Sequence, residues 1–153
     1  MMLISIGADH AGFETKEMLK NFLLNKKHTV FDIGAFTHQS GDDYPDFAKA
    51  VALDIVKGKA SKGIIVCGTG IGSSIAANKI KGIRASVCSS IYDVRMGRKH
   101  NDLNVLCLGS RALTDKRFIK RLVLTFLSTA FTEEERHRRR LEKISEIEKN
   151  ERP

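Results

Sequence analysis

The stretch Gly63-Ile-Ile-Val-Cys67-Gly-Thr-Gly-Ile-Gly72-Ser-Ser carries the clearest indication of both fold and chemistry in this sequence. A short apolar run, typical of a buried strand, ends at Cys67 and is followed by glycines at alternate positions. The small and apolar residues 71–77 then favour a helix. Because such a junction collects backbone N–H groups at a helix N-terminus, it predicts a site that stabilises an anion or a developing oxyanion, with Cys67 at its edge.

Spacing excludes three well-known phosphate loops. A Walker A loop needs a glycine followed by lysine where Ser73 and Ser74 stand. The dinucleotide-binding fingerprint needs glycine or alanine at position 73, and a cysteine-dependent phosphatase loop would have arginine there. The loop alone leaves two interpretations of Cys67 open: a catalytic thiol, or a small buried side chain at the end of a strand.

Length and cysteine content indicate the class of protein. With 153 residues the chain can build a full hydrophobic core, so we expect a single domain over residues 1–153. The odd number of cysteines disfavours a disulfide framework, and Cys88 and Cys107 lie in apolar runs typical of a core. The sequence enters a strand without a leader and has no apolar stretch long enough to cross a bilayer. We therefore predict a cytoplasmic protein without a membrane partner.

The net charge of +8 suggests an anionic ligand. Residues 132–153 carry seven Lys/Arg and seven Glu, so the positive excess lies in the rest of the chain. Spread lysines are typical of solvated helix faces, and no DNA- or RNA-binding motif accompanies them. A small anionic substrate is therefore favoured, and no nucleic-acid partner is expected.

Short apolar runs alternate with amphipathic segments along the chain. The expected strands are residues 3–7, 30–33, 63–67, 85–88 and 105–108. The expected helices are residues 13–24, 46–57, 71–79, 91–100, 116–130 and 133–151. Pro45 is expected near the first turn of the second helix, and Thr114 as the N-cap of the fifth. This alternation predicts a single-domain α/β fold, a doubly wound, five-stranded parallel sheet in a Rossmann-like three-layer sandwich with an extra C-terminal helix.

In such folds ligands bind outside the carboxyl ends of the strands. Polar or reactive residues follow the predicted strands at these ends: Asp9, His10, Tyr44, Cys67, Ser89, Ser90, Ser110 and Arg111. We therefore expect the chemistry to collect at one edge of the sheet.

Seven motifs occur in the order found in one enzyme family. They are Ile6-Gly-Ala-Asp9-His10-Ala-Gly12-Phe13, Asp43-Tyr44-Pro45, Cys67-Gly-Thr-Gly-Ile-Gly72, Ala76-Ala-Asn78-Lys79, Gly82-Ile-Arg84-Ala85, His100-Asn101-Asp102-Leu103-Asn104-Val105 and Gly109-Ser110-Arg111. With them the chain resembles the type B ribose-5-phosphate isomerases of the ribose/galactose isomerase family. The resemblance runs from the first predicted strand to the last predicted helix.

The resemblance implies an aldose–ketose isomerase that interconverts D-ribose 5-phosphate and D-ribulose 5-phosphate in the pentose phosphate pathway, through a cis-enediolate and without cofactor or metal. Two alternatives stay open: an isomerase of a six-carbon sugar phosphate (allose 6-phosphate or galactose 6-phosphate), and a non-catalytic sugar-phosphate-binding module. Galactose-6-phosphate subunits of the family tend to lose the His-Asn pair, which this chain keeps as His100 and Asn101. Binding alone needs neither a base nor a ring opener, so these residues and Cys67 favour the pentose enzyme.

By the same resemblance, Cys67 is the base that moves a proton between C2 and C1, and His100 opens the furanose ring. Asn101 would bind a substrate hydroxyl or a backbone oxygen. Some relatives use a glutamate base further along the loop, but residues 73–76 contain no carboxylate. The enediolate would be stabilised by the loop at Gly68, Thr69, Gly70, Ile71 and Gly72.

The resemblance also assigns the remaining ligands. Asp9 would bind sugar hydroxyls, and His10 the phosphate or a neighbouring oxygen. The arginines that correspond to phosphate ligands are Arg111, Arg136 and Arg140.

Two of these arginines come from a basic run. Arg136 and Arg140 are four residues apart, so a helix places both guanidinium groups on one face, where they can hold a dianion. Without the resemblance, the run would be typical of a solvated helix face paired with glutamates. His137 is predicted to be a surface residue.

Members of the family are homodimers or dimers of dimers whose active sites draw residues from two subunits. The predicted C-terminal helix, within residues 132–153, carries Leu141, Ile144 and Ile147 along one side. That side suits packing on a partner subunit or on the chain's own sheet.

Overall fold

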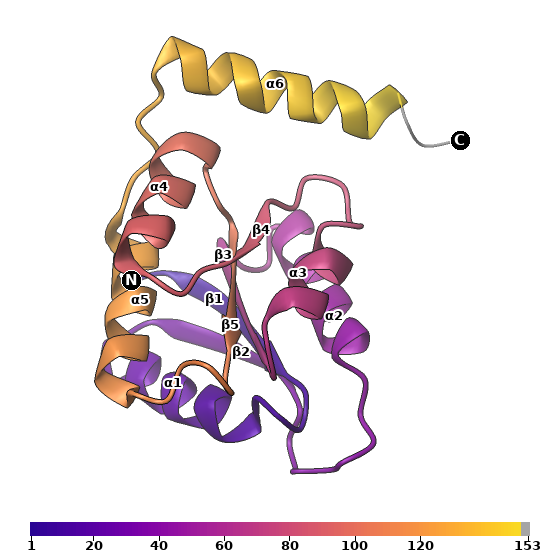
Figure 1. Cartoon of the computed structure of the whole chain (residues 1–153), viewed down its shortest axis with the longest axis vertical. Helices are drawn as coiled ribbons and strands as arrows, with labels where there is room; N and C mark the ends of the chain where they lie inside the picture. Colours follow the sequence, from indigo (N-terminus) through magenta and orange to yellow (C-terminus); the bar gives the residue numbers. More distant parts are fainter. Residues whose placement is uncertain (151–153) are drawn as a thin grey trace.

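Five strands form one parallel sheet in the order β2-β1-β3-β5-β4 (Figure 1). They are β1 (Leu3–Ala8), β2 (Thr29–Gly34), β3 (Lys62–Cys67), β4 (Ala85–Val87) and β5 (Val105–Gly109). In this computed structural model, which describes residues 1–150, all neighbouring strands run parallel. The predicted α/β fold with a five-stranded parallel sheet is confirmed.

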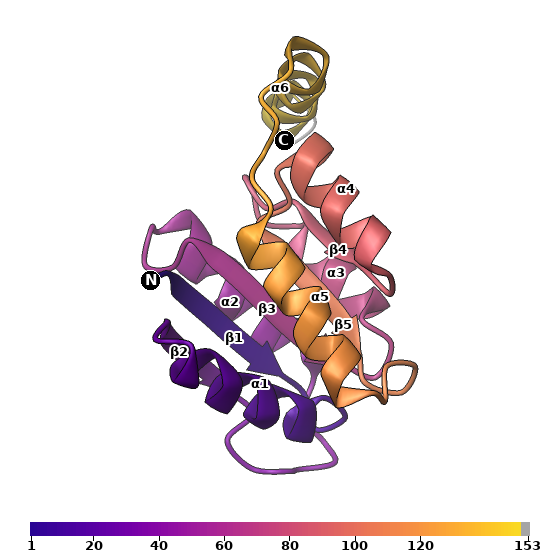
Figure 2. The ribbon, with the colours of Figure 1, turned by 90° about the vertical axis from the view of Figure 1, so that its left-hand side faces the viewer.

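Helices cover both faces of the sheet (Figure 2). The helices are α1 (Phe13–Asn25), α2 (Tyr44–Val56), α3 (Ile71–Ala77), α4 (Ile91–Asn101), α5 (Lys116–Ser128) and α6 (Glu135–Asn150). Helices α1, α4 and α5 pack on one face, and α2 and α3 pack on the other. Within residues 1–150, no helix is both long and apolar enough to cross a membrane.

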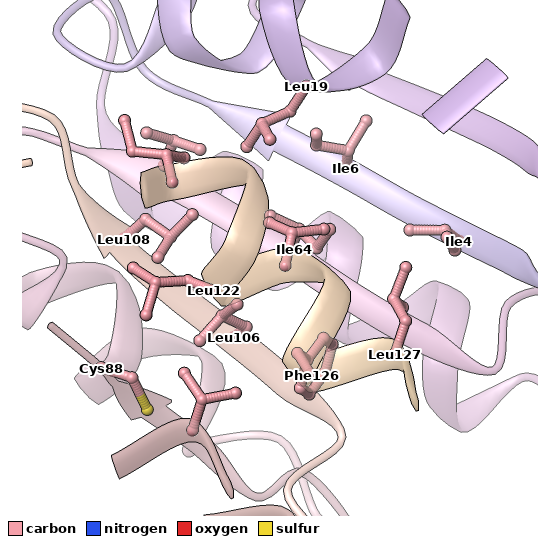
Figure 3. Packing of buried hydrophobic residues seen from close by; sticks show 14 of the residues in the cluster. Ile4, Ile6, Leu19, Ile64, Cys88, Leu106, Leu108, Leu122, Phe126 and Leu127 are labelled. Atoms are coloured by element: carbon pink, nitrogen blue, oxygen red, sulfur yellow. The ribbon is translucent and has the colours of Figure 1, made fainter. Parts of the chain in front are cut away.

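Strand periodicity divides the core into two halves. Ile64 and Val66 of β3 face α1, α4 and α5, whereas Ile65 between them faces α2 and α3. Figure 3 shows the larger half, where Leu122 and Phe126 of α5 pack over the sheet. Each such side chain stabilises the fold by about 1.5–3 kcal/mol.

Several predicted boundaries shift, and one predicted cap is wrong. The N-cap of α5 is Asp115, not Thr114, because the Asp115 carboxylate accepts hydrogen bonds from the backbone N–H groups of Arg117 (2.8 Å) and Phe118 (3.4 Å). Helix α6 begins at Glu135 instead of 133, because Glu133 has a φ of +53°, outside the helical region. Residue 151, the predicted last residue of this helix, lies outside the described residues.

Helix α6 lies beyond the end of α4, apart from the layers that cover the sheet (Figures 1 and 2). The backbone N–H of Gly82 donates to both carboxylate oxygens of Glu148, at 3.0 and 3.1 Å. Ile144 and Ile147 on this helix are nevertheless 39% and 60% exposed. An apolar side of α6 is therefore left largely uncovered by its own chain.

Candidate active site

A cleft of about 200 Å³ opens at the carboxyl ends of β1, β3 and β5. Its lining residues are Asp9, His10, Ala11, Tyr44, Cys67, Gly68, Thr69, Gly72 and Arg111. The side chains that follow β1, β3 and β5 therefore lie together at the carboxyl ends of the strands, as predicted. Tyr44 was predicted to lie at this edge but was not among the predicted site residues, although it belongs to the Asp43-Tyr44-Pro45 motif.

Cys67 ends β3 and is only 4% exposed. Its Sγ accepts a hydrogen bond from the backbone N–H of Gly70 at 3.1 Å. Gly70 has a φ of +79°, in the left-handed region that glycine adopts without strain. The turn thus directs an amide at the sulfur, where it stabilises negative charge on a thiolate.

The other two cysteines differ from Cys67. Cys88 and Cys107 are buried in the core, as predicted, and all three cysteines are free. Burial raises the pKa of Cys88 to about 11, and burial also raises the pKa of Cys107. Of the three, only Cys67 lines the cleft and receives an amide N–H from the glycine loop.

The glycine loop is fastened to the end of β5. The backbone N–H of Ser110 donates to the Cys67 carbonyl at 2.9 Å, and that of Arg111 donates to the Gly68 carbonyl at 3.0 Å. The Ser110 hydroxyl lies 2.7 Å from the Ala11 carbonyl, so β1, β3 and β5 are linked at their carboxyl ends. These bonds make the cleft a preorganised site.

Two glycines make room for side chains that enter the cleft. A Cβ on Gly68 would lie 3.1 Å from Cζ of Arg111, so the guanidinium group rests directly over the loop. A Cβ on Gly72 would lie 2.4 Å from Cζ of Tyr44, a distance that no real side chain tolerates. These two glycines therefore leave room for one cation and one phenol in the cleft that Cys67 also lines.

Asp9 and His10 directly follow β1, and both line the cleft. Asp9 is buried, its Oδ1 accepts the backbone N–H of Gly12 at 3.0 Å, and burial raises the pKa of its carboxyl. Nδ1 of His10 lies 2.7 Å from Oδ1 of Asp42, and this hydrogen bond raises the pKa of the imidazole. Asp42 was not among the predicted site residues.

A buried lysine of α1 contacts the start of the segment that carries Asp42. Lys16 is fully buried, and its Nζ donates to Asp32 Oδ1 at 2.8 Å and to the Ala35 carbonyl at 2.7 Å. Lys20 also pairs with Asp32, at 2.6 Å. This network anchors the chain directly after β2 and so determines where residues 36–43 reach the cleft.

The His100–Asn101 pair lies near the amino ends of the strands, away from the carboxyl ends at which the cleft opens. These residues end α4, and the chain enters β5 shortly afterwards at Val105. Val105 pairs with Gly63, whereas Cys67 pairs with Gly109 at the far end, about 13 Å along the strand. One chain therefore does not bring His100 and Asn101 together with Cys67.

A charged cluster holds the end of α4. Nε of Arg84 donates to the carbonyls of Asn101 (2.9 Å) and Asp102 (3.0 Å), and Nη1 of Arg98 donates to Oδ1 of Asp102 at 2.6 Å. Beside this cluster, Asn101, Leu103 and Ile144 help to line a second cavity of about 290 Å³. These hydrogen bonds hold the backbone that carries His100 and Asn101 next to α6.

The prediction that His137 is a surface residue is wrong. His137 is 2% exposed, its Nδ1 lies 2.8 Å from the Thr132 hydroxyl, and its ring centroid lies 4.3 Å from that of His100. Burial lowers the pKa of its imidazole. The helical turn points this one side chain toward the end of α4, while its neighbours in the basic run face solvent, and the sequence pattern could not identify which member turns inward.

Arg136 and Arg140 also lie away from the cleft. Both are on α6 and exposed, and Nε of Arg136 donates to Glu134 at 2.8 Å. Like His100 and Asn101, these two arginines therefore lie outside the cleft that contains Cys67. We name His100, Asn101, Arg136 and Arg140 the helix-end cluster, and the lining of the cleft around Cys67 the loop cluster.

Among residues 1–150, no group of three or more histidine, cysteine, aspartate or glutamate side chains is arranged to hold a metal ion.

Comparison with known proteins identifies relatives along almost the whole chain. The sequence model of the Ribose/Galactose Isomerase family matches residues 4–144. The ribose-5-phosphate isomerase B of Escherichia coli is 42% identical over 148 residues, which cover 97% of each protein. The likeness thus includes both the loop cluster and the helix-end cluster.

Solved structures agree with this finding. The ribose-5-phosphate isomerase B of Clostridium thermocellum has 44% sequence identity and a TM-score of 0.95, and the match covers 99% of this chain and 100% of that one. The enzyme of Mycoplasma genitalium, solved with bound ribulose 5-phosphate, has 39% identity and a TM-score of 0.92 over 97% of each chain.

Proposed function

This chain belongs to the ribose/galactose isomerase family, and on that premise we propose that it is an aldose–ketose isomerase that interconverts ribose 5-phosphate and ribulose 5-phosphate. The observation that carries this assignment is the thiol of Cys67, which faces the cleft and receives the Gly70 amide within a preorganised glycine loop. A structural relative with bound ribulose 5-phosphate supports a sugar phosphate as the ligand.

The reaction exchanges one carbon-bound proton. In the open-chain aldose, the Cys67 thiolate removes the proton on C2, and the electron pair moves through the C1–C2 bond onto the aldehyde oxygen. The resulting enediolate then takes the proton from the thiol at C1, while the C2 hydroxyl proton moves to O1. Amide N–H groups between Gly68 and Gly72 stabilise the negative oxygen, as in an oxyanion hole.

The loop cluster also supplies groups for the rest of the substrate. The buried carboxyl of Asp9 binds sugar hydroxyls, and the cations His10 and Arg111 attract the phosphate. Tyr44, held against Gly72, closes one side of the cleft and adds a phenolic hydroxyl.

The helix-end cluster completes the site from a second copy of the chain. His100 opens the sugar ring, Asn101 binds a substrate oxygen, and Arg136 and Arg140 hold the phosphate together with Arg111. The separation of the two clusters within one chain and the uncovered apolar side of α6 both support a homodimer, or a dimer of dimers, with shared sites. Three free cysteines are in keeping with a cytoplasmic enzyme.

Turnover of ribose 5-phosphate by the purified protein, measured in the presence of a chelator, tests the assignment. We expect formation of ribulose 5-phosphate at a rate well above that with allose 6-phosphate or galactose 6-phosphate. A preference for either hexose phosphate would transfer the assignment to that substrate, and binding without turnover of any of the three would indicate a sugar-phosphate-binding module.

A mixed dimer tests whether the site is shared. The variants Cys67→Ala and His100→Gln carry different tags and are co-expressed, so that dimers with one copy of each can be purified. If each site takes Cys67 from one chain and His100 from the other, one of the two sites is intact, and we expect about half of the wild-type activity. Each variant alone is nearly inactive. A mixed dimer as inactive as its parents would show that both residues act within one chain.

A further inference from the structure

Asp42 makes two hydrogen bonds to a single neighbour. Its Oδ1 lies 2.8 Å from the backbone N–H of His10 and 2.7 Å from Nδ1 of the same residue. The Asp42 side chain is 16% exposed, compared with 32% for His10. One carboxylate oxygen thus holds both the backbone and the ring of His10 at the wall of the cleft.

These contacts determine the protonation pattern of the ring. The Asp42 carboxylate can only accept, so Nδ1 of His10 carries a hydrogen whether the imidazole is neutral or charged. Nε2 is then the ring nitrogen that remains for a ligand in the cleft. When the ring is protonated, Nε2–H becomes a charged donor suited to a phosphate oxygen.

We propose that Asp42 is a positioning residue for phosphate recognition, which holds the His10 ring by Nδ1 and maintains it as a cationic Nε2–H donor at the cleft. This inference rests on the proposed sugar-phosphate activity, and it adds a residue that touches His10 rather than the substrate.

The surroundings of His10 explain why one carboxylate matters. Asp9, next in sequence, adds a second negative group, while the ring of His38 lies edge-on at 6.2 Å between centroids. Arg111, Cys67 and Tyr44 line the same cleft. A phosphate there meets the Arg111 cation of the same chain and the Arg136 and Arg140 proposed from the second copy. His10 adds a further charged donor from its own chain only as long as the imidazole is protonated.

The consequence is a defined dependence on pH. The Asp42 hydrogen bond raises the pKa of His10 above that of a free imidazole. Protonated His10 therefore persists to higher pH than it would without Asp42, and phosphate affinity is lost as the pH rises through the His10 pKa. Removing the carboxylate charge moves this loss to lower pH.

The neighbouring residue offers a matched control. Asp43 is exposed and precedes α2, and the described structure shows its side chain making neither a capping hydrogen bond nor an ion pair. Asp42→Asn and Asp43→Asn therefore remove the same charge one residue apart, and only the first replaces the charged acceptor of the His10 ring by a neutral amide oxygen.

The experiment combines NMR titration of the His10 ring nitrogens with binding of inorganic phosphate between about pH 5.5 and 9. In Asp42→Asn we expect the His10 pKa to fall, and phosphate affinity at the alkaline end to weaken about five- to tenfold relative to wild type. At the acidic end the two proteins bind alike. With ribose 5-phosphate, KM rises at alkaline pH while kcat changes little.

Asp43→Asn should behave like wild type in each of these measurements. An unchanged His10 pKa in Asp42→Asn, or an equal fall in both variants, would overturn the proposal. The wild-type protein gives a further test that needs no substitution: nitrogen shifts of neutral His10 must report a hydrogen on Nδ1, and one on Nε2 instead would also overturn it.

Failure of this proposal differs from failure of the proposed function. Ring titration and phosphate binding require no turnover, so they would report the role of Asp42 even if the protein did not isomerise ribose 5-phosphate. Conversely, the protein could isomerise ribose 5-phosphate while His10 has the same pKa in wild type and in Asp42→Asn. That result would support the proposed reaction and overturn the role of Asp42.

Discussion

Replacing Cys67 by alanine is expected to lower kcat for ribose 5-phosphate by about 10³–10⁴-fold, because no other group in the described loop can take the C2 proton. Residues 73–76 contain no carboxylate, and the cleft carboxyl of Asp9 is assigned to the sugar hydroxyls. Substrate affinity should change little, because the phosphate ligands are untouched. The measurement is steady-state turnover together with binding of ribose 5-phosphate to the inactive variant.

Cys88→Ala is the matched control for this substitution. Cys88 is also buried, but it belongs to the core and its burial raises its pKa to about 11, so it has no role in proton transfer. We expect activity close to wild type. Undiminished turnover by Cys67→Ala would mean that the base lies elsewhere in the cleft.

The second large effect is expected for His100→Gln, and it separates ring opening from proton transfer. Turnover of ribose 5-phosphate, which binds mainly as a furanose, should fall by about 10²–10³-fold. Ribulose 5-phosphate cannot form a furanose, because its O5 is phosphorylated, and therefore it enters the site already open. Exchange of its C1 hydrogen with deuterium from the solvent, which needs only the Cys67 base, should persist.

NMR of ribulose 5-phosphate in D₂O measures this exchange directly. Cys67→Ala should lose both exchange and turnover, whereas His100→Gln should lose only aldose turnover. His28→Gln, a histidine substitution between α1 and β2 and outside both clusters, serves as the control and should change neither. If His100→Gln lost exchange to the same extent as Cys67→Ala, the separate roles assigned to the two residues would be contradicted. His100 would then take part in the proton-transfer step.

Local sequence rules worked best where the structure is determined by neighbouring residues. The alternation of apolar runs and amphipathic segments predicted all five strands and six helices, with ends displaced by one to a few residues. The glycine loop after Cys67 was also predictable, because a strand, a left-handed glycine and a helix start are each short-range features. Asp115 shows the limit: two adjacent polar residues could cap α5, and only the backbone turn selects one of them.

The same rules did not find Asp42 as a partner of His10, since 32 residues separate them and the loop between them has no periodicity. They also misjudged His137, which is the inward member of a run of otherwise exposed polar residues. Both depend on contacts between segments that are distant along the chain.

The sequence by itself determined the parallel α/β fold, the cysteine at the end of the third strand and, through its motifs, the family. Only the tertiary structure decided that the predicted site residues form two separate clusters, because the register of β3 and β5 places Cys67 at the carboxyl ends of the strands and the end of α4 near their amino ends. Periodicity records which side of an element is buried, but the distance between two side chains follows from how whole elements pack. For that reason the candidate residues could be anticipated one by one, and the family resemblance already suggested a shared site, whereas the folded structure shows which of these residues lie in which cluster.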